Sequence, residues 1–184
     1  MKLYFIVFGF LLSISSAQAE VVGFSSAYNI ANWTSLIDGG TINTSLAPAS
    51  ISLTSSDDQS LEPNKYQEFT IAAVAPGQIS FNWAYESADT EAFGDDFGWV
   101  LNGVFTKLSD SDGLLSQNGV FSANISAGDV FGFRAYSFDS TGGAAITTIS
   151  QFAAPVPLPA AVWLFGTGLF GFLWQAKRKN LAVM

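Results

Sequence analysis

The chain has 184 residues, 49% of them hydrophobic, and this length suits one domain rather than two. It contains no cysteine and no histidine, which excludes disulfides, Cys/His zinc sites, thiol nucleophiles and Ser-His-Asp hydrolysis within this chain. All 15 acidic residues lie between Glu20 and Asp139 with only three bases among them, so this part carries a net charge of −12 and we expect no nucleic-acid partner.

The N-terminus has the three parts of a secretory signal peptide. A positive start and an apolar run over residues 3–12 are followed by small residues that end in an A-x-A cleavage pattern at Ala17 and Ala19. About 10 apolar residues fall short of the roughly 20 that a transmembrane helix needs, so a membrane anchor is the weaker interpretation. Cleavage after Ala19 would make Glu20 the first residue of the exported protein.

Between residues 20 and 153 no long stretch shows helical periodicity, but short apolar runs alternate with polar residues at a period of two. Turn-forming residues separate these runs. We expect strands over residues 41–43, 51–55, 69–73, 79–85, 97–101, 104–107, 120–125, 130–138 and 144–152. A spacing of about 10 to 15 residues between turns favours an all-β fold, a single antiparallel β-sandwich.

Two turns in this region are predicted in detail. Pro76 and Gly77 reverse the chain between two alternating runs, which predicts a hairpin with an aromatic inner face. Asn102 and Gly103 stand between two further runs, and Asn-Gly readily adopts the positive φ angles of a type I′ turn. A second hairpin is therefore expected there.

The C-terminal region is an apolar run closed by bases. Residues 158–176 contain no charge, and as a helix they would rise roughly 28 Å, close to the hydrocarbon thickness of a bilayer. Lys177, Arg178 and Lys179 follow, and the positive-inside rule places them in the cytoplasm and the body outside. A buried core helix is the weaker alternative, because a basic triplet has no role at the end of a core helix.

The residues that open this region, together with the apolar span and the basic cluster, resemble the PEP-CTERM sorting signal of exported bacterial proteins. The resemblance is carried by Val156, Pro157, Leu158 and Pro159, with Leu158 standing where the family motif has Glu. It implies recognition by an exosortase, a membrane cysteine protease that acts near the proline motif, in organisms that make extracellular polysaccharide. A plain anchor that is never cut is the competing interpretation.

The sequence thus divides into a signal peptide (1–19), a β-sandwich domain (20–153) and a sorting signal (154–184) with a transmembrane helix over 158–176 and a basic tail over 177–179. The body also resembles a domain often found ahead of this sorting signal. That resemblance is carried by residues 81–89, 95–103 and 128–133. It implies a jelly-roll or CUB-like sandwich, between a signal helix and a transmembrane helix, with no established activity.

The densest acidic group lies before the predicted strand at 97–101 and consists of Asp89, Glu91, Asp95 and Asp96. Calcium accepts six to eight oxygen ligands in flexible geometry, so these four are candidate calcium ligands. Asp57, Asp58 and Asp139 could join them if their loops meet. The spacing matches no EF-hand or RTX repeat, and a solvated acidic loop is the simpler alternative.

These features favour a structural or binding protein of the cell surface or biofilm over an enzyme. It would be exported across the inner membrane, held as a membrane-anchored precursor by its C-terminal helix, and released to the surface by an exosortase to bind extracellular polysaccharide. Candidates for stacking on sugar rings, if exposed rather than in the core, are Trp33, Tyr85, Trp99 and Tyr136. Alternatives are a stable lectin-like membrane protein and a hydrolase with two acidic-loop carboxylates, which Asp95→Asn or Asp96→Asn would inactivate.

Overall fold

A computed structural model of the chain describes residues 19–158 and Phe165. The predicted signal helix, with Ala17, lies outside the described residues, as do Pro159, nearly all of the predicted transmembrane helix and the basic tail. Within the described residues, no helix has both the length and the apolar character needed to cross a membrane.

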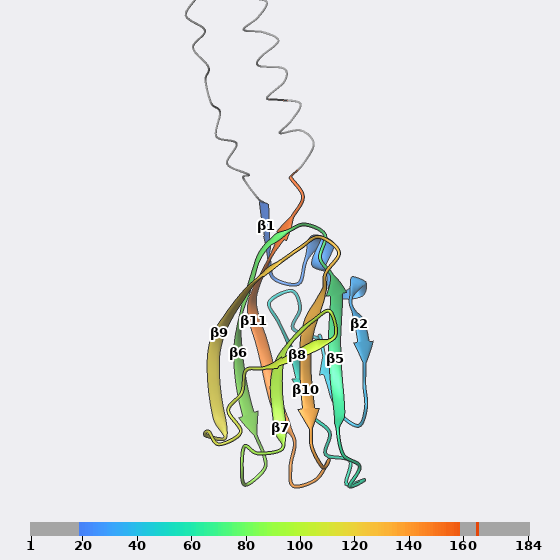
Figure 1. The fold of residues 1–184 in the computed structure, drawn as a ribbon, viewed down its shortest axis with the longest axis vertical. Helices are drawn as coiled ribbons and strands as arrows, with labels where there is room; N and C mark the ends of the chain where they lie inside the picture. The colour runs from blue at the N-terminus through green and yellow to red at the C-terminus, as the bar shows by residue number, and fades with distance from the viewer. Residues whose placement is uncertain (1–18, 159–164, 166–184) are drawn as a thin grey trace, which may run out of the picture.

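The described chain folds into two antiparallel β-sheets that face one another (Figure 1). The six-stranded sheet contains β1 (Ala19–Val22), β3 (Thr41–Asn43), β4 (Ser50–Thr54), β6 (Gly77–Ser87), β9 (Ser116–Ile125) and β11 (Ala145–Val156). Its strand order is β3-β4-β11-β6-β9, and β1 pairs with β11.

The five-stranded sheet has the order β2-β5-β10-β7-β8. Its strands are β2 (Thr34–Leu36), β5 (Lys65–Ala72), β7 (Asp95–Leu101), β8 (Val104–Lys107) and β10 (Val130–Ser137). Two short 3-10 helices, η1 (Ser26–Tyr28) and η2 (Ile30–Asn32), precede β2. The predicted all-β antiparallel sandwich is confirmed.

One predicted hairpin is confirmed and the other is wrong. Strands β7 and β8 pair across Asn102 and Gly103, whose φ angles of 50° and 81° are those a type I′ turn requires. The chain does turn at Pro76 and Gly77, but β5 pairs with β2 and β10, whereas β6 pairs with β9 and β11 in the other sheet. This turn therefore carries the chain from one sheet to the other.

The core between the sheets is built mainly from aromatic rings. On β6, side chains at alternate positions from Ile79 to Tyr85 are buried, as expected for a strand with one face on a core. The five-stranded sheet contributes Phe69, Phe97, Trp99, Phe131 and Phe133, and the first loop and the last strand contribute Phe24 and Phe152. Stacked and edge-to-face contacts between these rings add to the stabilisation from burial.

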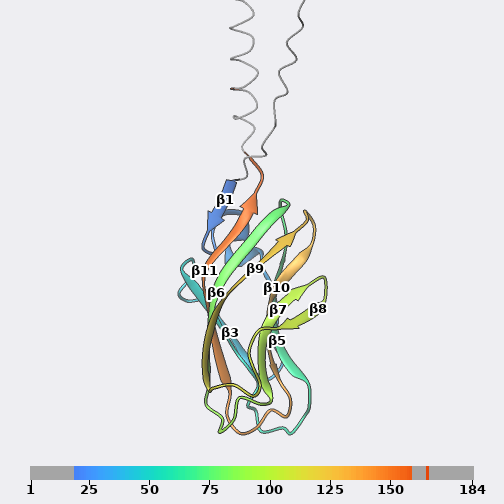
Figure 2. The same ribbon diagram turned by 60° about the vertical axis from the view of Figure 1, so that its left-hand side comes forward.

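The sandwich has two distinct ends (Figures 1 and 2). At the proximal end, β1 lies beside the last residues of β11, so the described chain starts and stops at the same place. The distal end carries the loops 55–64, 88–94, 108–115 and 138–144. Strand β11, with its 12 residues, runs from the distal end to the proximal end.

Candidate binding site at the distal end

A hollow of about 460 Å³, open to solvent, lies at the distal end between the loops 88–94 and 108–115. Its wall combines apolar and polar side chains from both loops. The first loop contributes Thr90, Glu91 and Phe93, and the second contributes Ser111, Asp112 and Leu114. No Lys or Arg is among the residues that line it. The hollow therefore offers apolar contacts and oxygen acceptors.

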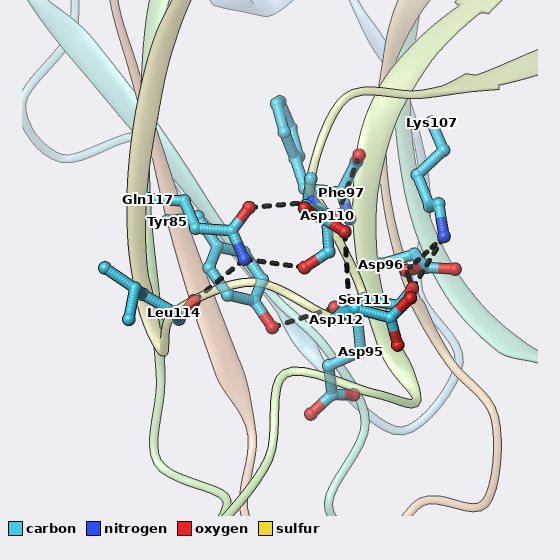
Figure 3. Close-up of polar contacts among 11 residues, drawn as sticks. Tyr85, Asp95, Asp96, Phe97, Lys107, Asp110, Ser111, Asp112, Leu114 and Gln117 are labelled. Carbon is cyan, nitrogen blue, oxygen red and sulfur yellow. Dashed lines mark hydrogen bonds and ion pairs between the residues drawn. The ribbon is translucent and has the colours of Figure 1, made fainter.

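The side chain of Gln117, on β9, fixes the shape of the second loop (Figure 3). Its Oε1 accepts a hydrogen bond of 2.7 Å from the backbone N–H of Asp110. Its Nε2 donates to the backbone carbonyls of Asp110 and Leu114, both at 2.8 Å. Gln117 thus satisfies backbone groups at both ends of the segment that lines the hollow, and holds Leu114 with 78% of its surface exposed.

Two hydrogen bonds anchor the first loop at its C-terminal end. The hydroxyl of Tyr85 donates a 2.9 Å hydrogen bond to the carbonyl of Asp95, where β7 begins (Figure 3). The carbonyl of Gly94 accepts a 2.7 Å hydrogen bond from the N–H of Phe138, which links this loop to the loop 138–144.

This link brings together two exposed aromatic side chains. The rings of Phe93 and Phe138 have centroids 6.1 Å apart, with 55° between their planes. Phe93 is 60% exposed and Phe138 49% exposed. Exposed apolar side chains that gather in one place mark an interaction surface more often than scattered ones do. Leu114, also exposed, lines the same hollow as Phe93, and we call Phe93, Phe138 and Leu114 the distal apolar cluster.

Beneath the same end lies a buried carboxyl group. Asp95 is 4% exposed, and its burial raises its pKa from 3.8 to about 6. Hydrogen bonds with the hydroxyls of Ser55 and Ser137 oppose this rise, and the charges of Asp89 and Asp139 add to it. Asp95 does not line the hollow, so its carboxyl group affects the stability of the fold and does not face a ligand in the hollow.

The structure does not bring the four predicted calcium ligands into one set. Asp95 points inward, whereas Asp96, the next residue of the strand, points to the other face and lies 3.5 Å from Lys107 Nζ. Asp89 accepts hydrogen bonds from its neighbour Thr90, while Glu91 lines the hollow. Within residues 19–158, no three or more carboxylates are grouped so as to hold a metal ion.

The additional acidic candidates do not complete such a set. Asp58 forms an ion pair with Lys65 at 2.6 Å, and Asp57 accepts a hydrogen bond from Gln59. Asp139 lies in the loop after β10, where it caps its own turn through the N–H of Thr141. Each of these carboxylates interacts with a residue in or next to its own loop.

Three of the four predicted sugar-stacking aromatics are core residues. Trp33, Tyr85 and Trp99 are 8%, 1% and 3% exposed, and Tyr136 is partly exposed on β10. The prediction did not include Phe93 and Phe138. Phe93 lies in a stretch of small and acidic residues outside any predicted strand, whereas Phe138 was the last residue of the predicted strand 130–138, which ends at Ser137 in the structure.

The residues predicted to lie at the two cleavage sites are at the opposite end of the sandwich. Val156 is the last residue of β11, and Ala19, the residue expected before the signal-peptide cut, is its register partner on β1. Pro157 is exposed and Leu158 is half-buried. The predicted last strand, 144–152, is therefore longer in the structure and extends to the sorting motif.

Comparison with known proteins identifies the C-terminal motif. A PEP-CTERM protein-sorting motif matches residues 155–179, which confirms the sorting signal predicted from the sequence. No curated protein sequence matches the chain.

Several solved structures are similar to the described fold. A family 35 carbohydrate binding module from Clostridium thermocellum has 15% identity and a TM-score of 0.38, over 73% of this chain and 97% of that one. A family 29 carbohydrate binding module complexed with cellulohexaose has 10% identity and a TM-score of 0.41, over 75% and 91%. A third, TmCBM61 in complex with beta-1,4-galactotriose, has 11% identity and a TM-score of 0.38, over 72% and 94%.

Proposed function

We propose that this chain is an exported bacterial surface protein whose body binds an extracellular polysaccharide through the hollow at its distal end. The sorting motif implies export and processing by an exosortase at the cell envelope. The observation that carries the binding proposal is the distal apolar cluster, which adjoins an open hollow lined by carboxylates and hydroxyls.

The placement of the two sites supports this role. The sorting motif begins at the proximal end, and the loops that line the hollow lie at the other end of β11 (Figure 1). Twelve strand residues at about 3.3 Å each separate the two ends by about 40 Å. In a precursor anchored through its C-terminus, the hollow would face away from the membrane, toward the surrounding matrix.

The chemistry of the hollow suits a sugar polymer. A pyranose ring presents an apolar face of C–H groups, which packs on aromatic and aliphatic side chains such as Phe93, Phe138 and Leu114. Its hydroxyl groups donate hydrogen bonds to carboxylates, here those of Glu91 and Asp112. A few convergent polar groups beside apolar surface are typical of a ligand site.

The charge of the hollow narrows the class of polymer. Carboxylates line it, and Lys107, which donates a 2.6 Å hydrogen bond to the lining residue Ser111, is already paired with Asp96, so a polyanionic glycan would be repelled. We therefore expect a neutral polysaccharide or one that contains amino sugars.

Binding of the mature protein to immobilised polysaccharides tests this proposal. We expect retention by neutral or amino-sugar polymers and weaker retention by polyanionic ones. The double variant Phe93→Ala, Phe138→Ala should lose binding, whereas Val104→Ala, which removes a 67% exposed side chain from β8, should bind like the wild type. Equal binding by the double variant would overturn the proposal.

Hydrolysis of the polymer is the less favoured function. The carboxyl group with a pKa raised to about 6 belongs to Asp95, which is buried away from the hollow. A general acid has to reach the glycosidic oxygen, so Asp95 is poorly placed for that role. Release of reducing ends from a bound polymer, abolished by Asp95→Asn or Asp96→Asn, would establish hydrolysis instead of binding.

A further inference from the structure

The end of β11 that runs into the sorting motif is held differently from the rest of the strand. Between Ala145 and Ser150 it lies between β4 and β6, both of which pair with it. The ladder with β4 ends at Ser150 and the ladder with β6 ends at Ala153. Within the described part of the chain, residues 154–156 have β1 as their only strand neighbour.

The side chain of Tyr28 also fixes this end of β11. The hydroxyl of the buried Tyr28 donates a 2.8 Å hydrogen bond to the carbonyl of Pro155, the first residue of the sorting motif. Ala154 and Pro155 are buried, whereas Pro157 is exposed. The boundary between folded body and accessible chain therefore falls at Val156, inside the matched motif.

We propose that β1 is a clamp over the body side of the exosortase cut: the cut falls after Val156, and it occurs when β1 separates from the end of β11. This inference rests on the proposed sorting by an exosortase. In the cut itself, a peptide bond C-terminal to Val156 is hydrolysed, so that one water is consumed, the body gains a carboxylate and the tail gains an amine.

The need for separation follows from how proteases bind their substrates. A protease cleft takes up several extended residues, often by pairing with their backbone as an added strand. Pro157 is the only residue between β11 and the predicted apolar span that starts at Leu158. Residues on the body side of the cut must therefore come from 154–156, and these are paired with β1 until it separates.

β1 is suited to local opening. It has four residues and, among the described strands, only β11 as a neighbour, and Val22, its last residue, is 73% exposed. Segments with few buried contacts open at a free-energy cost far below that of global unfolding. Cleavage of the signal peptide after Ala19 would also remove the residue that pairs with Val156, so the mature N-terminus would leave Val156 without its strand partner.

A reversible cross-link tests the clamp. Val21 and Ala154 are register partners, and directly opposed residues of antiparallel strands have Cα atoms about 4.5 to 5.5 Å apart, within disulfide range. The chain has no cysteine of its own, so Val21→Cys with Ala154→Cys can form one bond only. In cells that contain the exosortase, the full-length oxidised double variant should keep its tail and lose it on reduction. Each single cysteine variant should be cut as the wild type is.

A weakened clamp provides the opposite test. Tyr28→Phe removes the hydrogen bond to Pro155, of about 1 kcal/mol, together with the longer one that the Tyr28 hydroxyl accepts from the N–H of Val74 at 3.3 Å. It should accelerate tail removal about fivefold. Tyr136→Phe is the control, because it also removes a hydrogen-bonded tyrosine hydroxyl, but at the distal end. Pulse-chase labelling gives the rates, and intact mass gives the last residue retained.

The outcomes separate this inference from the function on which it rests. Tail removal at the wild-type rate in the cross-linked variant, or a mature chain that ends before Val156, overturns the clamp and leaves sorting in place. A wild-type chain that keeps its tail in the presence of the exosortase overturns both.

Discussion

Trp33 stacks on Phe69 with 4.8 Å between the ring centroids and 12° between the planes. The indole ring also stacks on Phe133, with 5.6 Å between the centroids, and its Nε1 donates a 3.0 Å hydrogen bond to the carbonyl of Tyr28. Trp33 comes from the segment that joins η2 to β2, so this stack fastens the irregular N-terminal region of the body into the core.

Replacing this ring should destabilise the whole sandwich. Trp33→Ala leaves a cavity beside two aromatic side chains, and such substitutions cost about 3 to 5 kcal/mol. Phe93→Ala removes an aromatic ring of similar size from the surface and should change stability by less than about 1 kcal/mol. Urea unfolding of both variants measures the difference. Equal losses of unfolding free energy in the two variants would show that the stacked Trp33 contributes no more to stability than an exposed ring does.

Local patterns in the sequence identify the strands and their buried faces. The alternation from Ile79 to Tyr85 and the Asn102-Gly103 turn each have a physical meaning within a few residues. Strand pairing cannot be predicted in the same way, because the alternation of apolar and polar residues indicates which face of a strand is buried but not which strand pairs with it. This is why β5 and β6 were predicted to pair although they lie in different sheets.

The candidate site depends on contacts between distant segments. Phe93 and Phe138 meet because two loops 45 positions apart end at the same edge of the sandwich, and no local pattern encodes that meeting. That the four acidic residues do not form one ligand set was partly predictable from the sequence. Once β7 is extended back to Asp95, alternation places Asp95 and Asp96 on opposite faces and rules out a shared ligand set.

The buried Asp95 should make the protein less stable as pH rises from about 4 to about 6. Its pKa is raised from 3.8 in the unfolded chain to about 6 in the fold, so the folded state holds its proton to higher pH. The unfolded chain binds fewer protons in this window, and stability falls with pH by up to about 3 kcal/mol in total. Unfolding free energies measured between pH 3 and pH 8 would reveal this slope.

Two aspartate variants identify the source of that slope. Asp95→Asn removes the charge from the buried position and should be more stable than the wild type above pH 6, with the slope between about 4 and 6 gone. Asp96→Asn changes the adjacent, partly exposed side chain and leaves Asp95 in place, so its slope should persist. A slope unchanged in Asp95→Asn would assign it to another group.

The ion pair between Asp58 and Lys65 should produce a pH dependence of the opposite sign. The hydrogen bond with Lys65 lowers the pKa of Asp58 from 3.8 to about 2. Its contribution is therefore present above pH 4 and lost as pH falls toward 2. Asp58→Asn should destabilise the protein at neutral pH, where the buried Lys65 keeps only Glu62 as a charged partner, and should match the wild type near pH 2.

Gln117 connects the fold to the proposed binding site. Its side chain makes three hydrogen bonds to the backbone of the loop 108–115, at Asp110 and Leu114. Gln117→Leu keeps the size of the side chain but cannot make these bonds, so the loop should open more often. We expect faster hydrogen exchange at the N–H of Asp110 and weaker polysaccharide binding, because a mobile loop has to be ordered on binding.

A control substitution at the next position of β9 shows whether the effect of Gln117→Leu comes from the loop or from a general change in the strand. Asn118 is exposed on the outer face of the strand, so Asn118→Leu changes the neighbouring position without touching the loop. It should leave both exchange at Asp110 and polysaccharide binding unchanged. If Gln117→Leu binds as tightly as the wild type while its loop exchanges faster, the ligand does not contact Leu114, and the site must be limited to the Phe93 and Phe138 side of the hollow.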